Sequence, residues 1–538
     1  MPRRAAGRRS VLWRRAGGLR GVGLALMVVV ALRVIQLGLV GALAGPDQGI
    51  ADRLLIWDGG WFINVAVDGY PSGYTYQSGT MVGNGFAFFP LFPLLIRAVA
   101  VLGIPASTAS LIVSGVSGLA AGALIYLLGT ALWSPRVGLI LMMLVSTQPM
   151  AVSLAMGYTE GLFLALVSGT LLATHQRVWW AAGLLGVGAA LTRPTGVAVG
   201  LALAVSVVLL WFTSRAERRT ASTPASGAGL DPTSDAISSI HAAASTVAIS
   251  SHQAASADVG AVPGGANIPA GGVFPSNATF PAGAAVGAAV PGAKAGAIGV
   301  AGAAGEAQAG PAGGVAGAGG VAGAGGEAGP SSEAGPGSEA GAGGGAESGT
   351  DSGAGRWRGK WFADKGPVTR RELWWAVSAA CASLVAAPLF LAWVGWRVGE
   401  WDAWFKVQTA GWGSTFDWGQ SVLVFLYDTL RGGTGMVDMV TAWLIVVAVA
   451  LCVVAASDRV WLPMLTFGLV ALTLALGQAG YWHSKPRLLV PVLLLACVPL
   501  ARALAKAPTR LATAILVLWM AFGLWFGAHM ITIWPFTI

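Results

Sequence analysis

The sequence predicts an all-α membrane protein, a polytopic transmembrane bundle of about ten to thirteen hydrophobic helices. Of its 538 residues, 55% are hydrophobic and only 10% are charged, whereas soluble domains carry about 25% charged residues. Its apolar runs are roughly 17 to 25 residues long, enough to cross a hydrocarbon core of ~30 Å. They are continuous rather than alternating, which argues against a β-barrel.

The first element is a basic segment, residues 1–20, which holds seven arginines and no acidic residue. Arginines before an apolar run mark the cytoplasmic side, so the net charge of +9 indicates membrane topology and not a nucleic-acid partner. The following run, 21–44, is too long for a signal-peptide core and lacks an obvious cleavage site. We therefore expect a retained helix that opens an N-terminal membrane module, 21–213.

The next two segments are not ordinary spans. Residues 45–85 are polar, aromatic and glycine-containing, and we expect them to form the first external loop. Residues 86–104 begin with the sequence FAFFPLFP, and two prolines in one turn weaken a helix. The sequence leaves open whether this segment crosses the membrane, re-enters it or lies at its surface.

The remaining apolar runs predict regular spans, with one exception. The stretch 179–212 is interrupted by TRPTG at 192–196, which predicts two half-length helices that meet at a break. The last five of the spans make up a C-terminal module, 372–538. The spans are expected near 107–131, 137–156, 158–174, 373–395, 437–456, 460–479, 487–505 and 511–533.

A linker at 214–371 separates the two modules. Its central part, 222–355, is dominated by Gly, Ala, Ser and Pro, and such a chain buries too little apolar surface to offset its ordering entropy. The linker is predicted to be a disordered cytoplasmic insert, either simply tolerated or acting as a tether or regulator.

Basic clusters orient the bundle, because arginine and lysine accumulate on the cytoplasmic side. On this basis four regions share the opposite, outer face: 45–85, 157–160, 397–435 and 481–487. The clusters are Arg215, Arg218 and Arg219; Arg356, Arg358 and Lys360; Arg370 and Arg371; and Arg502, Lys506 and Arg510.

Asp58 is the foremost candidate for chemistry on that face. It stands between Trp57 and Trp61 in the run IWDGGWFINVAVDGYP, and ionisable groups near a bilayer usually mark function. The alternative is turn chemistry, because Asp before Gly-Gly also caps short helices. Asp68 is a second, weaker candidate in the same loop.

Glu160 and Arg193 are candidates because each is isolated in apolar sequence. Glu160 lies in GYTEG between two apolar runs, where it either faces the site or satisfies the open N–H groups of a helix start. Arg193 is the only charge in the broken 179–212 stretch. A guanidinium at that depth needs a carboxylate or a phosphate as partner.

The segment HSKPR places His483, Lys485 and Arg487 on the outer side, against the positive-inside trend. These side chains either bind a lipid-borne phosphate or extend to lipid head groups. Eight tryptophans fall between Trp374 and Trp418; they indicate an aromatic belt, with Trp401 and Asp402 as secondary candidates for stacking against a sugar.

Other functional classes have little support. The cysteines Cys381, Cys452 and Cys497 all fall in apolar helices and suggest neither disulfides nor a metal site. No phosphate-binding glycine loop suggests a nucleotide, and no cofactor or metal is expected.

Five ordered segments resemble the PIG-V-like mannosyltransferases, a family of GT-C class membrane enzymes: WDGGWFINVAVDGYP, FAFFPLFPLLIR, GYTEGLFLAL, ALTRPTGVAVG and HSKPRLLVPVLLL. The resemblance covers the membrane part of the chain and leaves out 222–355. The family often has tyrosine at the position of Phe62. Bacterial members of this kind take a sugar from a polyprenyl phosphate outside the cytoplasm, and the acidic residue expected as their base maps onto Asp58.

The resemblance implies an inverting mannosyl transfer from a polyprenyl-phosphate donor to a glycan or glycolipid acceptor at the outer face of the plasma membrane. Asp58 would be the base, Glu160 would orient the acceptor or Arg193, and Arg193, Lys485 and Arg487 would hold the phosphate. Two alternatives stay open: a transporter or flippase for a lipid-linked sugar, since broken helices and buried charges also occur there, and a non-catalytic subunit that binds glycolipid.

Overall fold

The computed structural model describes residues 11–46, 48–222, 362–363, 366–432 and 435–538, without the side chains of 216–222. The chain divides into two units, 1–244 with 351–538 and 245–350, and the second unit lies outside the described residues. The same holds for the predicted insert at 222–355, for the cluster Arg356, Arg358 and Lys360, and for the side chains of Arg218 and Arg219.

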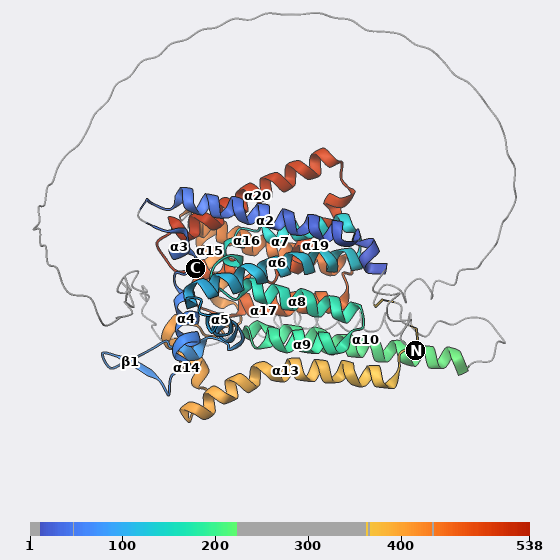
Figure 1. The fold of residues 1–538 in the computed structure, drawn as a ribbon, viewed down its shortest axis with the longest axis horizontal. Helices are drawn as coiled ribbons and strands as arrows, with labels where there is room; N and C mark the ends of the chain where they lie inside the picture. Colours follow the sequence, from blue (N-terminus) through green and yellow to red (C-terminus); the bar gives the residue numbers. More distant parts are fainter. Residues whose placement is uncertain (1–10, 47, 223–361, 364–365, 433–434) are drawn as a thin grey trace, which may run out of the picture. The chain divides into compact units, whose positions relative to one another are not determined.

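The described part of the chain is an almost entirely helical bundle (Figure 1). Six of its helices are long and apolar enough to cross a membrane, since each turn of helix advances about 5.4 Å. The protein is therefore a multi-pass helical membrane protein, as the sequence predicted. The six spans are α2 (Gly18–Leu43), α6 (Ala106–Leu132), α10 (Val197–Ser222), α13 (Arg370–Val398), α16 (Met436–Ser457) and α20 (Thr509–Thr532).

Shorter apolar helices fill the space between the spans. Together with the six spans, they bring the number of described apolar helices within the expected ten to thirteen. One of them is half of a broken pair: Trp482–Leu488 meets α19 (Leu493–Lys506) at a bend of 62°. The others are α5 (Leu91–Ala100), α7 (Pro135–Ser146), α8 (Glu160–His175), α9 (Trp179–Ala190) and α17 (Leu462–Gly477).

Three predicted spans differ in the structure, and the one expected at 487–505 is the bent pair just described. The break in 179–212 is present, where the 3-10 turn η3 (Pro194–Gly196) separates α9 from α10. However, α10 is 26 residues long and not half-length, because the sequence after Pro194 is uninterrupted and apolar. The span predicted at 137–156 is instead the 12-residue α7 followed by a turn and the 3-10 helix η2 (Ala151–Leu154); Pro149 prevents a continuous helix.

Arg33 stabilises this second break from within the membrane. Its guanidinium donates to the carbonyl of Ser146 at 2.8 Å and to that of Ala151 at 2.7 Å. These carbonyls belong to the end of α7 and the start of η2, and a carbonyl without a partner is costly in a bilayer. An arginine on α2 thus supplies the hydrogen bonds that the interrupted helix cannot make.

Helix α5 settles the open question about 86–104. It has 10 residues and so extends only ~15 Å, half of a hydrocarbon core. It does not cross, and the Leu91 N–H donates to the Leu191 carbonyl at 3.0 Å, beside the α9–η3 break. The preceding 3-10 turn η1 (Gly85–Ala87) and its neighbours contribute four buried phenylalanines, Phe86, Phe88, Phe89 and Phe92. Of these, Phe88 and Phe92 contact Phe62 of α4.

The segments expected as outer loops contain short helices and a hairpin. They gather at one end of the bundle, on the left of Figure 1. Apart from a short helix at Asp58, which was one of two alternatives, these elements were not predicted, since none is apolar enough to stand out. They are α3 (Ile50–Leu54), α4 (Asp58–Asp68), β1 (Thr75–Gln77), β2 (Thr80–Val82), α14 (Ala403–Trp412), α15 (Gln420–Gly432), η4 (Trp482–Ser484) and α18 (Lys485–Leu488).

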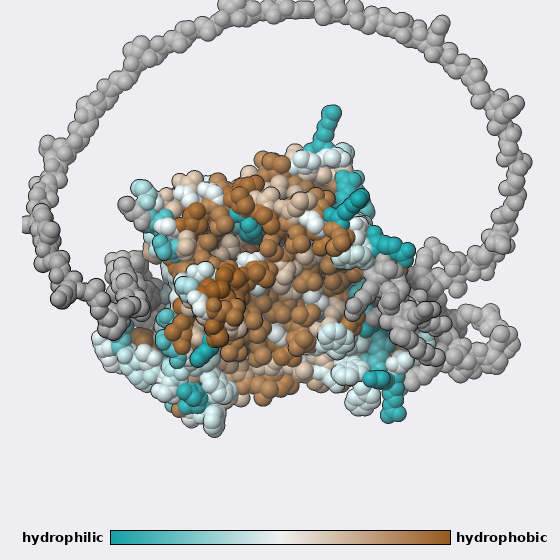
Figure 2. Space-filling model, viewed as in Figure 1, coloured by the Kyte–Doolittle hydropathy of each residue, from teal (hydrophilic) through white to brown (hydrophobic). Residues whose placement is uncertain are grey.

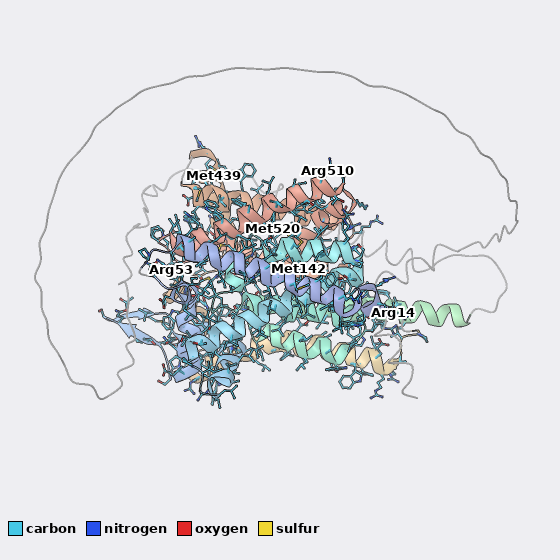
Figure 3. All side chains as sticks on the ribbon, turned by 45° about the horizontal axis from the view of Figure 1, so that its top comes forward. Arg14, Arg53, Met142, Met439, Arg510 and Met520 are labelled. Atoms are coloured by element: carbon cyan, nitrogen blue, oxygen red, sulfur yellow. The ribbon has the colours of Figure 1, made fainter. Side chains whose placement is uncertain are left out.

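The polarity of the surface changes along the length of the bundle. Figure 2 shows hydrophobic residues over the middle of one face and hydrophilic residues toward its left and right ends. Figure 3 places Arg53 and Met439 toward one end, Arg14 and Arg510 toward the other, and Met142 and Met520 between them. Polar groups therefore mark both ends of an apolar belt.

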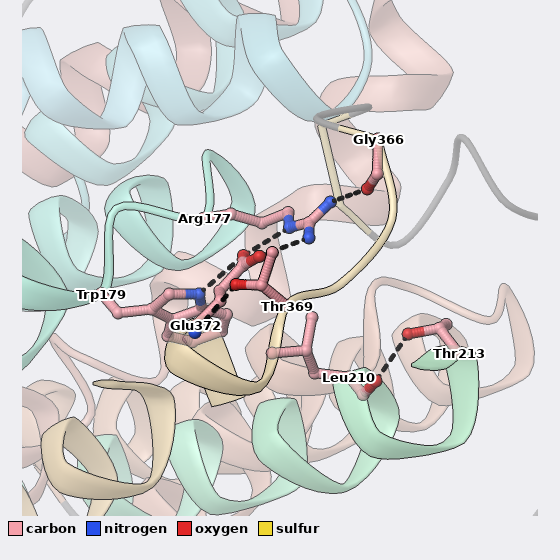
Figure 4. Close-up of polar contacts among 7 residues, drawn as sticks. All are labelled: Arg177, Trp179, Leu210, Thr213, Gly366, Thr369 and Glu372. Atoms are coloured by element: carbon pink, nitrogen blue, oxygen red, sulfur yellow. Dashed lines mark hydrogen bonds and ion pairs between the residues drawn. The ribbon is translucent and has the colours of Figure 1, made fainter. Parts of the chain in front are cut away.

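A buried ion pair fastens the end of the bundle that carries Arg14 and Arg510. Arg177 Nε and Nη2 donate to the two carboxylate oxygens of Glu372, both at 2.6 Å, and Trp179 Nε1 donates to the same carboxylate at 3.1 Å (Figure 4). Thr369 Oγ1 caps α13 by accepting the Glu372 N–H at 3.1 Å. The α8–α9 turn is thereby joined to the start of α13.

Candidate functional site

A chain of four charged side chains lies at the end of the bundle opposite the Arg177–Glu372 pair. Arg487 Nη1 donates to Asp58 Oδ2 at 2.6 Å, and Arg487 Nε lies 3.6 Å from Glu160 Oε1. The same Glu160 oxygen accepts from Arg193 Nη1 at 2.6 Å. Asp58, Arg487, Glu160 and Arg193 thus alternate in sign, although they come from four elements far apart in the sequence.

Asp58 is placed by an unusual backbone turn. Trp57, the residue before it, has φ of 54°, a conformation that costs a bulky residue energy and often occurs at functional sites. The turn makes Asp58 the first residue of α4, where the helix dipole favours a negative charge. Trp57 holds the N-cap position and no side chain among the described residues caps α4 by a hydrogen bond, so the Asp58 carboxylate pairs with Arg487 and does not act as a cap.

Glu160 lies at the centre of the chain of charges. Its side chain is only 2% exposed, and its second oxygen, Oε2, has no hydrogen-bond partner among the described residues. As the first residue of α8 it also stands at a positive helix end. A buried carboxylate is tolerated only when it is paired, and here two guanidinium groups share it.

Gly157 permits the close approach that brings Glu160 to Asp58. A Cβ at this position would lie 2.6 Å from Ser110 Oγ and 2.8 Å from Leu55 Cδ2, so near that these side chains would have to shift. The Gly157 N–H also donates to the Leu54 carbonyl at 2.8 Å. The segment before α8 is thereby held directly against the segment before α4.

Tyr158, which was not among the residues predicted for the site, supports Arg487. The guanidinium carbon of Arg487 lies 5.0 Å from the centre of the Tyr158 ring, a cation–π distance. The Tyr158 hydroxyl donates to the Ile56 carbonyl at 3.1 Å, which fixes the ring beside Asp58. Its position in GYTEG, two residues before Glu160, was the signal available in the sequence.

Lys485 is buried and bound to backbone oxygens. Its Nζ donates to the carbonyl of Ala475 at 3.0 Å and to that of Gln478, at the C-terminal end of α17, where a cation is favoured. Gln478 pairs in turn with Phe416 in an antiparallel bridge. No carboxylate of the described residues forms an ion pair with Lys485 within 4.0 Å.

These charges line a cavity of about 350 Å³. Asp58 and Glu160 supply two negative charges, and Arg193, Lys485 and Arg487 supply three positive ones, so the lining carries one positive charge in excess. Polar groups on the walls include Thr192, Thr195, Gln408, Ser414, Tyr481 and Ser484. Apolar groups include Phe88, Trp404, Phe405, Trp412, Phe416 and Leu488.

The other residues selected from the sequence do not line this cavity. His483 is buried and packs against the rings of Tyr481, Trp482 and Trp534. Asp68 is exposed at the last position of α4. Trp57 packs against the hydrophobic core.

Trp61 and the Trp401–Asp402 pair also lie outside the cavity lining. Trp61 stacks on Phe88, with ring centres 6.0 Å apart, and meets Trp412 edge-on, so it supports two lining residues from behind. Trp401 is 86% exposed, and Asp402 pairs with Lys406 at 3.1 Å. Trp404 and Trp412 are the tryptophans of this region that line the cavity.

A second polar cluster joins the hairpin to α14 beside the cavity. Glu400 Oε2 accepts from the Tyr74 hydroxyl and from Lys406 Nζ, both at 2.6 Å. The hydrogen bonds from Lys406 and Tyr74 lower the pKa of Glu400. Desolvation and the bond to Glu400 raise the pKa of Tyr74 to about 12.

The described residues contain no group of three or more His, Cys, Asp or Glu side chains arranged to hold a metal ion. Comparison with known proteins adds no relative: no family model, no curated protein and no solved structure matches this chain.

Proposed function

We propose that this protein is a GT-C type membrane glycosyltransferase. It transfers a sugar, mannose by the resemblance of its five segments, from a polyprenyl-phosphate donor to a glycan or glycolipid hydroxyl, with inversion. The observation that carries the proposal is the alternating chain Asp58–Arg487–Glu160–Arg193 on the wall of one cavity.

Asp58 and the arginines fit the two halves of the reaction. The acceptor oxygen attacks the anomeric carbon and its proton passes to Asp58, while the bond from that carbon to the phosphate oxygen breaks and its electron pair leaves with the phosphate. The phosphate gains negative charge as it departs, and Arg487 and Arg193 are positioned to stabilise it. Glu160 orients both guanidinium groups.

The charge of the cavity suits the donor. A polyprenyl-phosphate sugar is a phosphodiester with one negative charge, and the charged groups of the lining have one positive charge in excess. Lys485 is the lining cation that forms no ion pair within 4.0 Å among the described residues, and the carboxylate that acts on it from farther away is Asp417. Binding of such a donor would bring the summed charge of these groups to zero.

The apolar and aromatic walls suit the rest of the substrates. Phe405, Phe416 and Leu488 offer an apolar surface to an isoprenoid chain. Trp404, Trp412 and Tyr481 offer ring faces and polar tips, the kind of surface on which sugar rings stack. Gln408, Thr192 and Thr195 add hydrogen-bonding groups for sugar hydroxyls.

Arg14 and Arg510 support an orientation for the proposed enzyme. They lie at the end of the bundle away from Arg53 (Figure 3), and basic residues accumulate on the cytoplasmic side. We therefore assign the cavity to the extracytoplasmic face of the plasma membrane, where a lipid-linked donor replaces a nucleotide sugar.

The test is a transfer assay with purified full-length protein, radiolabelled polyprenyl-phosphate mannose and extracted cell-envelope lipids. Wild type should form a labelled product. Asp58→Asn should lower the rate by about 10²–10⁴-fold, the scale of a lost general base, while Asp52→Asn, an exposed carboxylate outside the cavity, should not.

Three results would contradict the proposal. Full activity of Asp58→Asn would remove this residue as the base. Movement of the donor across vesicles with no product would favour the transporter or flippase. Donor binding without turnover in every lipid extract would favour a non-catalytic subunit.

A further inference from the structure

The Asp58–Arg487 ion pair joins two groups that have separate tasks in the proposed transfer. Asp58 has to accept the acceptor's proton, and Arg487 has to bind the phosphate. Asp58 Oδ2 accepts from Arg487 Nη1 at 2.6 Å, and the two side chains are only 18% and 13% exposed. A carboxylate bound in this way is a weaker base toward the proton of an acceptor hydroxyl, because the guanidinium stabilises its negative charge. The guanidinium, for its part, has one donor fewer for a phosphate.

The other edge of the Arg487 guanidinium is buried against Glu160. Its Nε makes no hydrogen bond within the described residues, and Glu160 Oε1, at 3.6 Å, is beyond hydrogen-bond distance. A guanidinium offers five N–H donors in a planar fork that matches two phosphate oxygens. Because the Nε edge faces the Glu160 carboxylate, a phosphate has to take the Nη1 edge that Asp58 now occupies, while Tyr158 and Glu160 still hold Arg487 in place.

Resting on the proposed function, we propose that the Asp58–Arg487 pair is a resting-state lock that the donor phosphate opens. The phosphodiester replaces Asp58 as the partner of Arg487, and Asp58 turns to the acceptor as the base. Opening the lock exchanges one ion pair for another and breaks no covalent bond. The base is thus released only when the leaving group is already bound.

The lock makes a prediction that is unusual for a catalytic residue: removing the charge of Asp58 should tighten binding of the phosphate. Without Asp58 the ligand no longer has to displace a carboxylate. Purified full-length Asp58→Asn should bind farnesyl monophosphate about tenfold more tightly than wild type, the scale of one hydrogen bond to a charged group. Asp52→Asn should bind as wild type does, and farnesol, which lacks the phosphate, should show no difference among the variants.

A double-mutant cycle assigns the effect to Arg487. Arg487→Gln should weaken binding of farnesyl monophosphate at least about tenfold, and the gain from Asp58→Asn should vanish in the Arg487→Gln background. A misfolded variant cannot bind more tightly, so the gain is informative even if one variant is less stable. Arg487→Lys, which keeps the charge but not the fork, provides a second test with intermediate affinity.

The outcomes separate the lock from the proposed function. If wild type prefers farnesyl monophosphate to farnesol but Asp58→Asn binds no tighter, the lock is refuted and the donor chemistry stands. The lock is also refuted if the gain persists in the double variant. If wild type shows no preference for the phosphate, the proposed donor itself is contradicted.

Discussion

At the scale of single residues, the site depends on Glu160. Its carboxylate is 2% exposed and is shared by Arg193 at 2.6 Å and Arg487 at 3.6 Å, so it holds two like charges in one small cavity. Buried charges are stable only in such pairs, and removing one partner costs more than removing both. The arrangement connects stability directly with the position of the phosphate-binding groups.

Glu160→Gln should therefore destabilise the protein by about 3–5 kcal/mol and also reduce transfer. The double variant Glu160→Gln/Arg193→Gln should lose less stability than the sum of its single variants, because Arg193 is no longer left facing a neutral amide. Denaturation of the purified variants, followed by circular dichroism, measures both effects. Strictly additive losses would show that the pair is not coupled.

At the scale of secondary-structure elements, close packing of the short segments sets the geometry of the site. Gly157 brings the start of α8 against the start of α4, and Tyr158 and Glu160 follow it directly. A Cβ at Gly157 would lie 2.6 Å from Ser110 Oγ. The position of Asp58 relative to Glu160 therefore depends on a glycine that takes no part in the chemistry.

Gly157→Ala should lower the rate of transfer by about 10²-fold, the effect of displacing reacting groups by ~1 Å. The matched control is Gly60→Ala on α4, where an added Cβ meets nothing within 4 Å and alanine should stabilise the helix by about 0.5–1 kcal/mol. Transfer rates and melting temperatures of both variants distinguish the two effects. Equal activity of Gly157→Ala and wild type would mean that this close approach does not position the site.

The cluster that joins the hairpin to α14 should respond to acid. Because the folded-state pKa of Glu400 is lowered, its contribution to stability is present above the ordinary carboxyl pKa and is lost as the pH falls through the folded value. Fluorescence of the adjacent, exposed Trp401 should therefore stay constant from neutral pH to about pH 4 and change below it. In Glu400→Gln this transition should be absent; an unchanged transition would assign it to another group.

At the scale of the whole described bundle, the sequence predicts the long helices, because hydropathy determines them. It predicts little of the short helices and of the ion pairs, because these depend on polar contacts. The bounds expected for α2, α13, α16 and α20 differ from the observed ones by a few residues, because long apolar runs are unambiguous. Helices α14 and α15 were missed because they are short and mixed in polarity. A contact between Glu160 and Arg193 was one of the two roles expected for Glu160, and it is present. The pairing of Asp58 with Arg487 was beyond sequence reasoning, because the two residues are separated by 429 positions.

The proposed orientation of the protein in the membrane can be tested by labelling single cysteines. If the cavity faces away from the cytoplasm, Ser78→Cys in the turn of the β1–β2 hairpin should react with a membrane-impermeant maleimide in intact cells. Arg510→Cys, at the end that also holds Arg14 (Figure 3), should react only after the membrane is made permeable. Both variants are prepared with Cys381, Cys452 and Cys497 replaced by alanine, since these thiols are free. The reverse labelling pattern would place the cavity in the cytoplasm, where a lipid-linked donor outside the cell could not reach Arg487.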